Sequence, residues 1–224
     1  MNRYDKERLE TASEMAFRLI REDIIAGKLA PGQKLRLEQL KDSYAVSVST
    51  LRETLSRLAS ENLVLAEGQR GFEVAPVSIT ELENLGDLRL LLESHAIGLS
   101  FKAGDLDWEA RVVAAHHKLA AIERQLLRGD LARTVDWVRF DWEFHQALAS
   151  ACGSAVLMDA LSSTFDRFLR YHLLAKSFRG KPVTDDHRHL LDLAMGRDVD
   201  GARAMMTQHV RSGIDHVIKS GLIA

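Results

Sequence analysis

The apolar and polar positions between residues 36 and 74 divide into two short amphipathic segments, a tight turn and a two-stranded ribbon. In the second segment Leu51, Leu55 and Leu58 recur at helical spacing, so one apolar face is expected to lie against a core. Residues 46–48 join the two segments. This succession predicts a helix-turn-helix followed by a β-hairpin wing.

The predicted ribbon consists of the apolar runs 63–65 and 72–74, which flank Glu-Gly-Gln-Arg-Gly at 67–71. Two glycines around Gln69-Arg70 suit a hairpin tip that turns sharply. Such a tip can place the Arg70 cation near a phosphate or in a minor groove. Taken alone, the same pattern also fits an ordinary hairpin.

The polar side of the second predicted helix is a candidate surface for reading DNA. Its residues opposite the leucines are Ser49, Arg52, Ser56 and Arg57, and Ser47 or Ser49 can cap the helix. An arginine fork matches phosphate oxygens or guanine acceptors, and serine can bond either. A polar helix face is usually just solvated, but its position between a turn and a wing favours DNA binding.

Helix signals also lie upstream of this module. Thr11 with Glu14 three residues later forms a capping box that opens a first helix, and Gly27 ends it. The first ten residues are mostly polar. We therefore predict a flexible arm over 1–10 and a winged helix-turn-helix domain over 11–76.

From residue 80 onward the pattern is helical and contains no credible strand. Thr80 with Glu83 forms a second capping box after a linker at 77–79. Breaks that contain glycine separate six expected helices: 80–102, 106–128, 130–151, 154–176, 184–195 and 198–219. The predicted fold is therefore mainly α, with a bundle of about six helices, mostly antiparallel, over 80–220.

Composition and charge limit the size and class of the protein but do not identify its function. Its 224 residues, 46% of them hydrophobic, suffice for one small and one medium domain. The net charge is −2, and residues 1–76 contain twelve Lys plus Arg and twelve Asp plus Glu, a net charge of zero. This balance counts against DNA binding, because such modules are usually basic. A neutral module can bind if its cations gather on one face, so we expect modest, salt-sensitive affinity.

The single cysteine, Cys152, excludes an intramolecular disulfide and fits a reducing compartment. No apolar stretch approaches the roughly eighteen residues that a membrane span requires. These features predict a cytoplasmic protein with no membrane partner.

All nine histidines lie at or beyond His95. Asp141 and His145 are four residues apart, so both project from one face of a helix that also carries apolar residues. A buried carboxylate and imidazole need a partner, and a metal ion would be one. His187 and His209 lie on the last two predicted helices. Three imidazoles and one carboxylate suit zinc, nickel, manganese or iron, although spacing alone leaves open hydrogen-bonded core histidines.

These features together closely resemble the GntR family of bacterial transcription regulators. The resemblance is carried by the helix at 11–27, Pro31-Gly32-Gln33-Lys34-Leu35, Val46 to Glu53, Arg57-Leu58 and Arg70-Gly71-Phe72-Glu73-Val74. The helical part looks like the effector domain of the FadR subfamily, the FCD type, and the match runs from about residue 11 to about residue 219. The resemblance implies a double-stranded DNA operator as the partner.

The resemblance also implies site residues. Family members contact DNA at the positions of Thr50, Arg52, Arg70 and Gly71, and our full candidate set adds Arg36, Ser49 and Arg57. Val48 and Glu38 depart from the family pattern, because many members carry an arginine at the position of Val48 and some carry another at the position of Glu38. The operator therefore need not follow the usual family consensus, and nearby Arg36 is a candidate substitute.

The metal-binding pattern of the FadR-type effector domain is matched at all four positions, Asp141, His145, His187 and His209. The resemblance therefore implies these ligands for a divalent metal ion, with zinc preferred. His189 and His216 are candidates for supporting the ligands. Ordinary surface or packing roles are expected for His95, His116, His117 and His172.

A metal with open coordination positions attracts small carboxylates or hydroxy acids, and proteins resembling this chain are generally thought to sense such metabolites. Arg89 could clamp the acid through its fork, or it could form a salt bridge to Glu93 four residues on. We expect a homodimeric repressor that binds a roughly palindromic operator. Acid binding would then change the spacing or angle of the reading helices.

The main alternative from another class is a metal-dependent hydrolytic enzyme that uses the same four ligands. The chain has no H-E-x-x-H motif, so we expect no enzyme. A third possibility is a repressor that responds to the metal itself.

Overall fold

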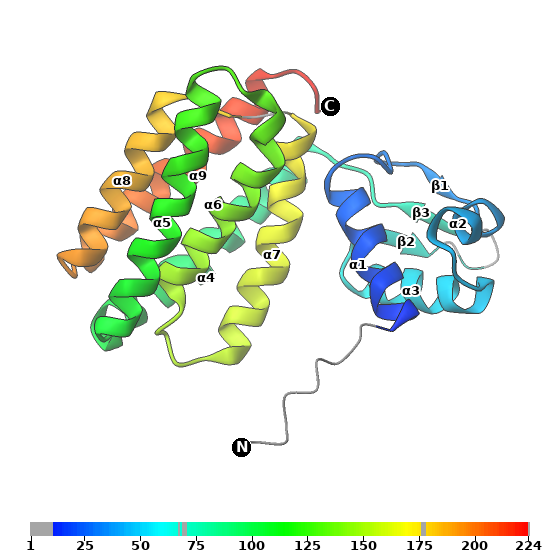
Figure 1. Ribbon diagram of the computed structural model, residues 1–224, viewed down its shortest axis with the longest axis horizontal. Coiled ribbons are helices and arrows are strands. Elements are labelled where there is room, and N and C mark those ends of the chain that lie inside the picture. Colours follow the sequence, from blue (N-terminus) through cyan, green and yellow to red (C-terminus); the bar gives the residue numbers. More distant parts are fainter. Residues whose placement is uncertain (1–10, 67, 69–70, 176–177, 224) are drawn as a thin grey trace. The chain divides into compact units, whose positions relative to one another are not determined.

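The computed structural model describes residues 11–66, 68, 71–175 and 178–223. The chain divides into two compact units, Met1–Pro76 and Val77–Ala224. In its described part, the first unit combines three helices with three short strands, and the second is a bundle of helices (Figure 1). The mainly α fold predicted from the sequence is confirmed. The predicted arm at 1–10 lies outside the described residues.

The N-terminal unit begins with the predicted capping box. Its elements are α1 (Ala12–Ile25), β1 (Lys34–Leu35), α2 (Leu37–Tyr44), α3 (Val48–Ser60), β2 (Val64–Ala66) and β3 (Phe72–Val74). The backbone nitrogen of Glu14 donates to Thr11 Oγ1 (3.2 Å), and the backbone nitrogen of Thr11 donates to Glu14 Oε2 (2.8 Å). These two bonds satisfy donors that the first turn of α1 would otherwise leave open.

The two predicted strands pair antiparallel, with Val64 opposite Val74 and Ala66 opposite Phe72. The sequence pattern did not predict β1, which pairs with the other edge of β3 and makes the strand order β1-β3-β2. Two residues are too few to show an alternating pattern. β1 forms because Gly32, with a φ of 73°, turns the chain onto β3 and donates its N–H to the Val74 carbonyl (3.0 Å).

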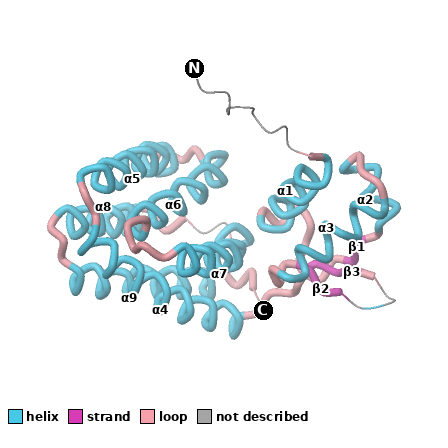
Figure 2. Tube along the Cα trace, turned by 90° about the horizontal axis from the view of Figure 1, so that it is seen from below, coloured by secondary structure: helices cyan, strands magenta, loops and turns pink. Residues whose placement is uncertain are grey.

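The predicted apolar face of α3 forms the centre of this unit. Leu51, Leu55 and Leu58 have no exposed surface and belong to one cluster with Ile20 and Ile24 of α1. Each buried leucine stabilises the fold by roughly 2 kcal/mol. The strands lie beside α3 (Figure 2), so its opposite, polar side stays open to solvent.

The C-terminal unit contains the expected six α-helices within its described residues. They are α4 (Ile79–Ala103), α5 (Leu106–Leu127), α6 (Thr134–Ala149), α7 (Ala155–Leu174), α8 (Lys181–Met195) and α9 (Val199–Lys219), with a short 3-10 helix, η2 (Leu131–Arg133), before α6. The prediction of one helix over 130–151 missed this 3-10 turn. α8 begins three residues before the predicted 184, because Pro182 fits the first turn, where no N–H is needed.

The capping box predicted at Thr80 and Glu83 is wrong. α4 starts at Ile79, and its cap is Ser78, whose Oγ accepts from the Glu81 backbone nitrogen at 3.1 Å. A tertiary contact holds this start, because the Ser78 backbone nitrogen donates to Tyr171 Oη (3.3 Å), which itself donates to Glu81 Oε2 (2.7 Å).

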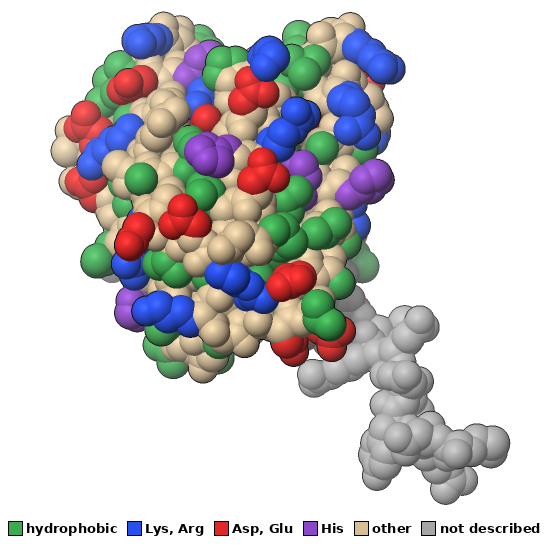
Figure 3. Space-filling model, turned by 90° about the vertical axis from the view of Figure 1, so that its left-hand side faces the viewer, with side chains coloured by type: hydrophobic (Ala, Val, Ile, Leu, Met, Phe, Trp, Pro, Cys, Tyr) green, Lys and Arg blue, Asp and Glu red, His purple; other side chains and the backbone are tan. Residues whose placement is uncertain are grey.

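Helix α4 packs against α6, α7 and α9, and its outer face is exposed (Figures 1 and 2). Helices α5 and α8 pack against each other, α5 also against α6, and α8 also against α9. On the face of the bundle in Figure 3, basic and acidic side chains are interspersed. Among the described helices, none is both long and apolar enough to cross a membrane.

Candidate functional site

The four predicted metal ligands meet inside the bundle. Asp141 and His145 project from α6, His187 from α8 and His209 from α9, and all four residues are buried. One ligand atom from each lies within 4.8 Å of the others. The helical spacing of Asp141 and His145 places both on the inner face of α6, and the packing of α8 and α9 supplies the other two.

Each of the three histidines has a carboxylate beside its Nδ1 nitrogen. The pairs are His145 with Glu93 of α4 (2.6 Å), His187 with Glu123 of α5 (2.6 Å) and His209 with Asp186 of α8 (3.3 Å). An ionised carboxylate only accepts, so each Nδ1 is the donor in its pair. When the imidazole is neutral, this tautomer leaves Nε2 with a free lone pair, which is how protein carboxylates orient metal-binding imidazoles.

The Nε2 atoms of His187 and His145 face the Asp141 carboxylate. Asp141 Oδ1 lies 3.0 Å from His187 Nε2 and 3.8 Å from His145 Nε2. His187 Nε2 is buried and has no hydrogen-bond partner of suitable geometry among the described residues. Three imidazole nitrogens and one carboxylate oxygen form a donor set that fits zinc or a related divalent ion.

The charged groups of the cluster shift one another's pKa values. Burial raises the pKa of Glu93, but the charges of Arg89 and His145 and their hydrogen bonds outweigh burial and lower it to about 2. Burial likewise opposes ionisation of Asp141, yet His145 and His187 hold the pKa of that carboxyl well below its usual range. Burial lowers the pKa of His187, whereas the Asp141 and Glu123 carboxylates raise it to about 9. Glu93 and Asp141 are therefore ionised, and Asp141 and Glu123 favour a proton on His187 that a metal ion bound at Nε2 would replace.

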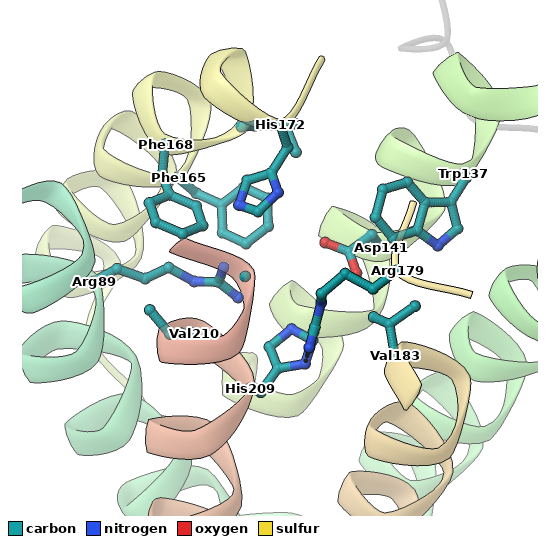
Figure 4. Close-up of a pocket in the computed structure, with 12 residues that line it drawn as sticks. Arg89, Trp137, Asp141, Phe165, Phe168, His172, Arg179, Val183, His209 and Val210 are labelled. Atoms are coloured by element: carbon teal, nitrogen blue, oxygen red, sulfur yellow. Dashed lines mark hydrogen bonds between the residues drawn. The ribbon is translucent and has the colours of Figure 1, made fainter. Parts of the chain in front are cut away.

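A cavity lies beside the cluster and shares Asp141 and His209 with it (Figure 4). Its volume is about 20 Å³, on the order of the space that one ordered water molecule needs. The other residues that line it include Arg89, Trp137, Phe165, Phe168, Leu169, His172, Arg179, Val183 and Val210. Polar groups at the cluster and apolar walls around them are typical of a site for a small organic ligand.

Arg89 forms the salt bridge to Glu93 that its sequence position predicted, and it lies at the cavity where the predicted acid clamp would act. Its Nε donates to Glu93 Oε2 at 2.8 Å, which is the predicted salt bridge, and the residue also lines the cavity. Its Nη2 lies 3.3 Å from both ring nitrogens of His145. The guanidinium lies 4.4 Å from the ring centre of Phe165, so its orientation is fixed on several sides.

Several important residues escaped prediction. Glu123, Asp186 and Arg179 carry no local pattern that connects them with the histidines, although Asp186 is adjacent to His187. His172, expected to be an ordinary packing residue, lines the cavity, and burial lowers its pKa to about 3. His189 was a candidate for supporting the ligands, but it is exposed and lines a groove between α8 and α9.

The first turn of α3 presents part of the candidate DNA-binding surface. Ser47 is the cap, because its Oγ accepts from the Thr50 backbone nitrogen at 3.1 Å. The same Oγ lies 2.7 Å from Ser49 Oγ and 2.9 Å from Thr50 Oγ1. Ser49 and Arg52 are exposed, and Thr50 is half-buried. The structure therefore brings these polar groups to one end of α3.

The other DNA-binding candidates lie on different elements. Arg36 is exposed at the start of α2, and Gly71 has a φ of 98°, which favours glycine at this turn. Arg70 lies outside the described residues. The Arg57 guanidinium lies 4.1 Å from the ring centre of Phe17 on α1, so this arginine also stabilises the unit by a cation–π contact.

Comparison with known proteins yields similarity over both units. Residues 12–74 match the family described as bacterial regulatory proteins, gntR family, and residues 84–212 match the FCD domain. The chain is 37% identical over 213 residues to the HTH-type transcriptional regulator BphR of Paraburkholderia xenovorans, covering 94% of this chain and 86% of that protein. It is 32% identical over 206 residues to the HTH-type transcriptional repressor GlaR of Escherichia coli, covering 88% and 92%. The solved structure of E. coli McbR/YncC shares the fold, with a TM-score of 0.76, 19% identity and coverage of 93% of this chain and 98% of that one.

Proposed function

Because the chain belongs to the GntR family of bacterial regulatory proteins, we propose that its FCD domain binds a metal ion and a small carboxylate that together control DNA binding. The chain is a DNA-binding transcriptional regulator, as the sequence predicts. The matched families and the relatives named above are regulators, so the expectation that it is no enzyme is confirmed. The metal, the acid and the direction of control belong to the proposal.

The observation that carries the proposal is the convergence of Asp141, His145, His187 and His209 beside an arginine-lined cavity. These four residues would hold the ion, and zinc suits their nitrogen-rich set best, with nickel, manganese and iron as the other candidates. The bound ion would supply a positive charge that attracts a carboxylate. Glu93, Glu123 and Asp186 keep the imidazoles in the tautomer that such binding needs.

Arg89 is the proposed clamp for the acid. Glu93 accepts from its Nε and the Phe165 ring lies 4.4 Å from its guanidinium, which together hold the fork at the cavity wall. Its Nη2 lies 3.3 Å from the ring nitrogens of His145, so a ligand carboxylate would compete with His145 for this donor. A guanidinium and a carboxylate match in two parallel hydrogen bonds, which gives both strength and orientation.

For DNA, we assign the reading surface to the exposed start of α3. Arg52 and Ser49 would contact base edges or phosphates, with Thr50, Arg36 and the wing residues Arg70 and Gly71 as further contacts. Arg57 remains a weaker candidate, because it also packs against Phe17. A homodimer would present two such surfaces to a palindromic operator. Repression is the preferred polarity, and the name of the relative GlaR supports it.

The test uses full-length protein and fluorescence anisotropy with a labelled fragment of its own upstream promoter. Zinc-loaded protein should bind this fragment more tightly than a scrambled duplex of equal length, and a small acid such as lactate or succinate should change that affinity. Coupling of this kind is typically about 1 to 3 kcal/mol. A chelator should abolish the response to acid.

Equal binding to promoter and scrambled DNA would contradict the proposal. Release of DNA by zinc alone, with no further effect of acids, would instead favour a regulator that responds to the metal itself.

A further inference from the structure

A second cavity lies where α5 packs against α8 (Figure 1). Its volume is about 90 Å³, enough for several water molecules, since one needs about 10 to 15 Å³. Its polar lining consists of His116, Glu123 and Arg124 of α5 and of Thr184 and Arg188 of α8. Among the described residues, none lines both this cavity and the cavity beside the metal cluster. The two cavities are therefore separate.

Arg124 and Arg188 are the two cationic residues of this second cavity, and each comes from a different helix. Neither arginine forms a hydrogen bond or an ion pair with another residue in the described part of the chain. Arg211 of α9, by contrast, pairs with Asp87 of α4. Two like charges that line one cavity repel each other, and an anion between them would remove this repulsion.

The packing of α5 on α8 fixes where the two arginines begin. Glu123 and His187 join these helices through the 2.6 Å hydrogen bond, and both side chains are buried. Arg124 directly follows Glu123 in sequence, and Arg188 directly follows His187. The backbone positions of both arginines are therefore set by a rigid buried contact, which suits a preformed site.

A third donor at the cavity is His116. Its half-buried ring packs edge-on against Phe144, with 5.3 Å between ring centres. Within the described ranges, its ring nitrogens have no hydrogen-bond partner. The Thr184 hydroxyl donates to the Lys181 carbonyl at 2.8 Å, so it offers the cavity only lone pairs. Donors at the cavity therefore come from two guanidinium groups and one imidazole.

The chemistry of the lining indicates the class of ligand. Glu123 is the carboxylate at the cavity, and its Oε1 already accepts from His187. Two guanidinium groups suit an anion that carries several oxygens and more than one charge, and the arginine fork matches a phosphate group in two parallel hydrogen bonds. The apolar part of the lining is limited to Ala120 and Leu127, which gives little surface for a carbon chain.

We propose that the cavity between α5 and α8 binds a phosphate group, held by Arg124 and Arg188 with His116 as a third donor. Inorganic phosphate and the phosphate of a small ester present the same oxygens, and the experiment below separates these two sources. This site does not depend on the proposed metal or acid. A failure of the acid response would leave it standing.

The test measures binding of inorganic phosphate and of glycerol 3-phosphate to the full-length protein by isothermal titration calorimetry at constant ionic strength, because salt screens exposed charges. The variants are Arg124→Gln and Arg188→Gln, which replace exposed side chains and should leave the fold intact. The control is Arg128→Gln, an exposed arginine at the end of α5 that does not line the cavity. Each cavity variant should lower phosphate affinity on the order of tenfold, and the control should bind as wild type does.

The two probes identify the source of the phosphate. Tighter binding of glycerol 3-phosphate than of inorganic phosphate would assign the site to a phosphorylated metabolite, and the reverse order would assign it to the free ion. Acetate is the third probe. Acetate affinity equal to that of both phosphate compounds, with the same dependence on the two arginines, would overturn the phosphate class.

Phosphate has two other places to bind, the proposed metal ion and the DNA-binding surface. The titrations are therefore repeated with folded metal-free protein and with Arg52→Ala, and binding should persist in both. Loss of binding in either, with unchanged binding in Arg124→Gln and Arg188→Gln, would overturn the inference. Absence of measurable binding of both phosphate compounds to wild type would also overturn it.

Discussion

Glu123 Oε1 accepts a hydrogen bond of 2.6 Å from His187 Nδ1, although 64 residues separate the two in sequence. Both side chains are buried, Glu123 on α5 and His187 on α8. The bond fixes the imidazole so that Nε2 faces Asp141. One carboxylate outside the ligand set thus orients a ligand within it.

Replacing Glu123 should therefore weaken metal binding without removing a ligand. We expect Glu123→Ala to lower zinc affinity by roughly tenfold to a hundredfold, the usual effect of losing such a supporting carboxylate. Competition with a chromophoric chelator measures this change. The control is Glu143→Ala, which removes only a half-exposed ion pair with Lys118 and should leave zinc affinity as it is. Equal affinity of wild type and Glu123→Ala would show that the 2.6 Å bond does not support metal binding.

Removing a metal-ligating residue should abolish the response to acids but not the binding to DNA. His145→Ala takes one imidazole from the cluster and leaves the N-terminal unit, Met1–Pro76, unchanged. Zinc measured by mass spectrometry should fall well below about one ion per chain, the occupancy that a single four-ligand site predicts. The response to acids should disappear, while binding to the promoter persists. Retention of stoichiometric zinc by this variant would refute the assigned ligand set.

Arg52→Ala should have the opposite effect. This exposed side chain on α3 belongs to the reading surface, and loss of a base contact costs about 1 to 3 kcal/mol of binding free energy. Anisotropy with the promoter fragment measures the loss, and zinc content should not change. Arg111→Ala, an exposed arginine on α5, is the control for net charge. A promoter affinity equal to that of the Arg111→Ala protein would remove Arg52 from the reading surface.

Ser47→Ala should destabilise the N-terminal unit. Ser47 Oγ accepts from the Thr50 backbone nitrogen and caps α3, and loss of such a cap lowers the free energy of unfolding by about 1 kcal/mol. Urea denaturation followed by circular dichroism measures the change. Ser56→Ala, an exposed position inside the same helix, should be neutral or slightly stabilising, because alanine favours helix. Equal effects of the two substitutions would argue against the cap.

Local pattern was sufficient for features that lie within one element. The spacing of Leu51, Leu55 and Leu58 predicted the buried face of α3, and the capping box predicted the start of α1. Asp141 and His145 are one helical turn apart, so their common face follows from periodicity. His187 and His209 could be joined to them through resemblance to a known family, because no local rule links residues on separate helices.

The sequence pattern predicted the wrong start for α4, because two neighbouring residues fitted a capping box equally well. Ser78 and Thr80 are each followed three residues later by a glutamate, so either can open a helix. The structure selects Ser78 through Tyr171, which lies 93 residues away in sequence. β1 shows the same dependence, because two residues become a strand through pairing with β3.

By itself, the sequence determined the order of the α-helices, the buried face of α3 and the types of side chain available for metal, acid and DNA, since these depend on periodicity and residue chemistry. Tertiary structure alone decided that Glu123 orients His187 and that Arg179 shares a cavity with Arg89. The physical reason is that these groups come from different elements. Their distances depend on how whole helices pack, and helix packing is set by many buried contacts together rather than by any local pattern.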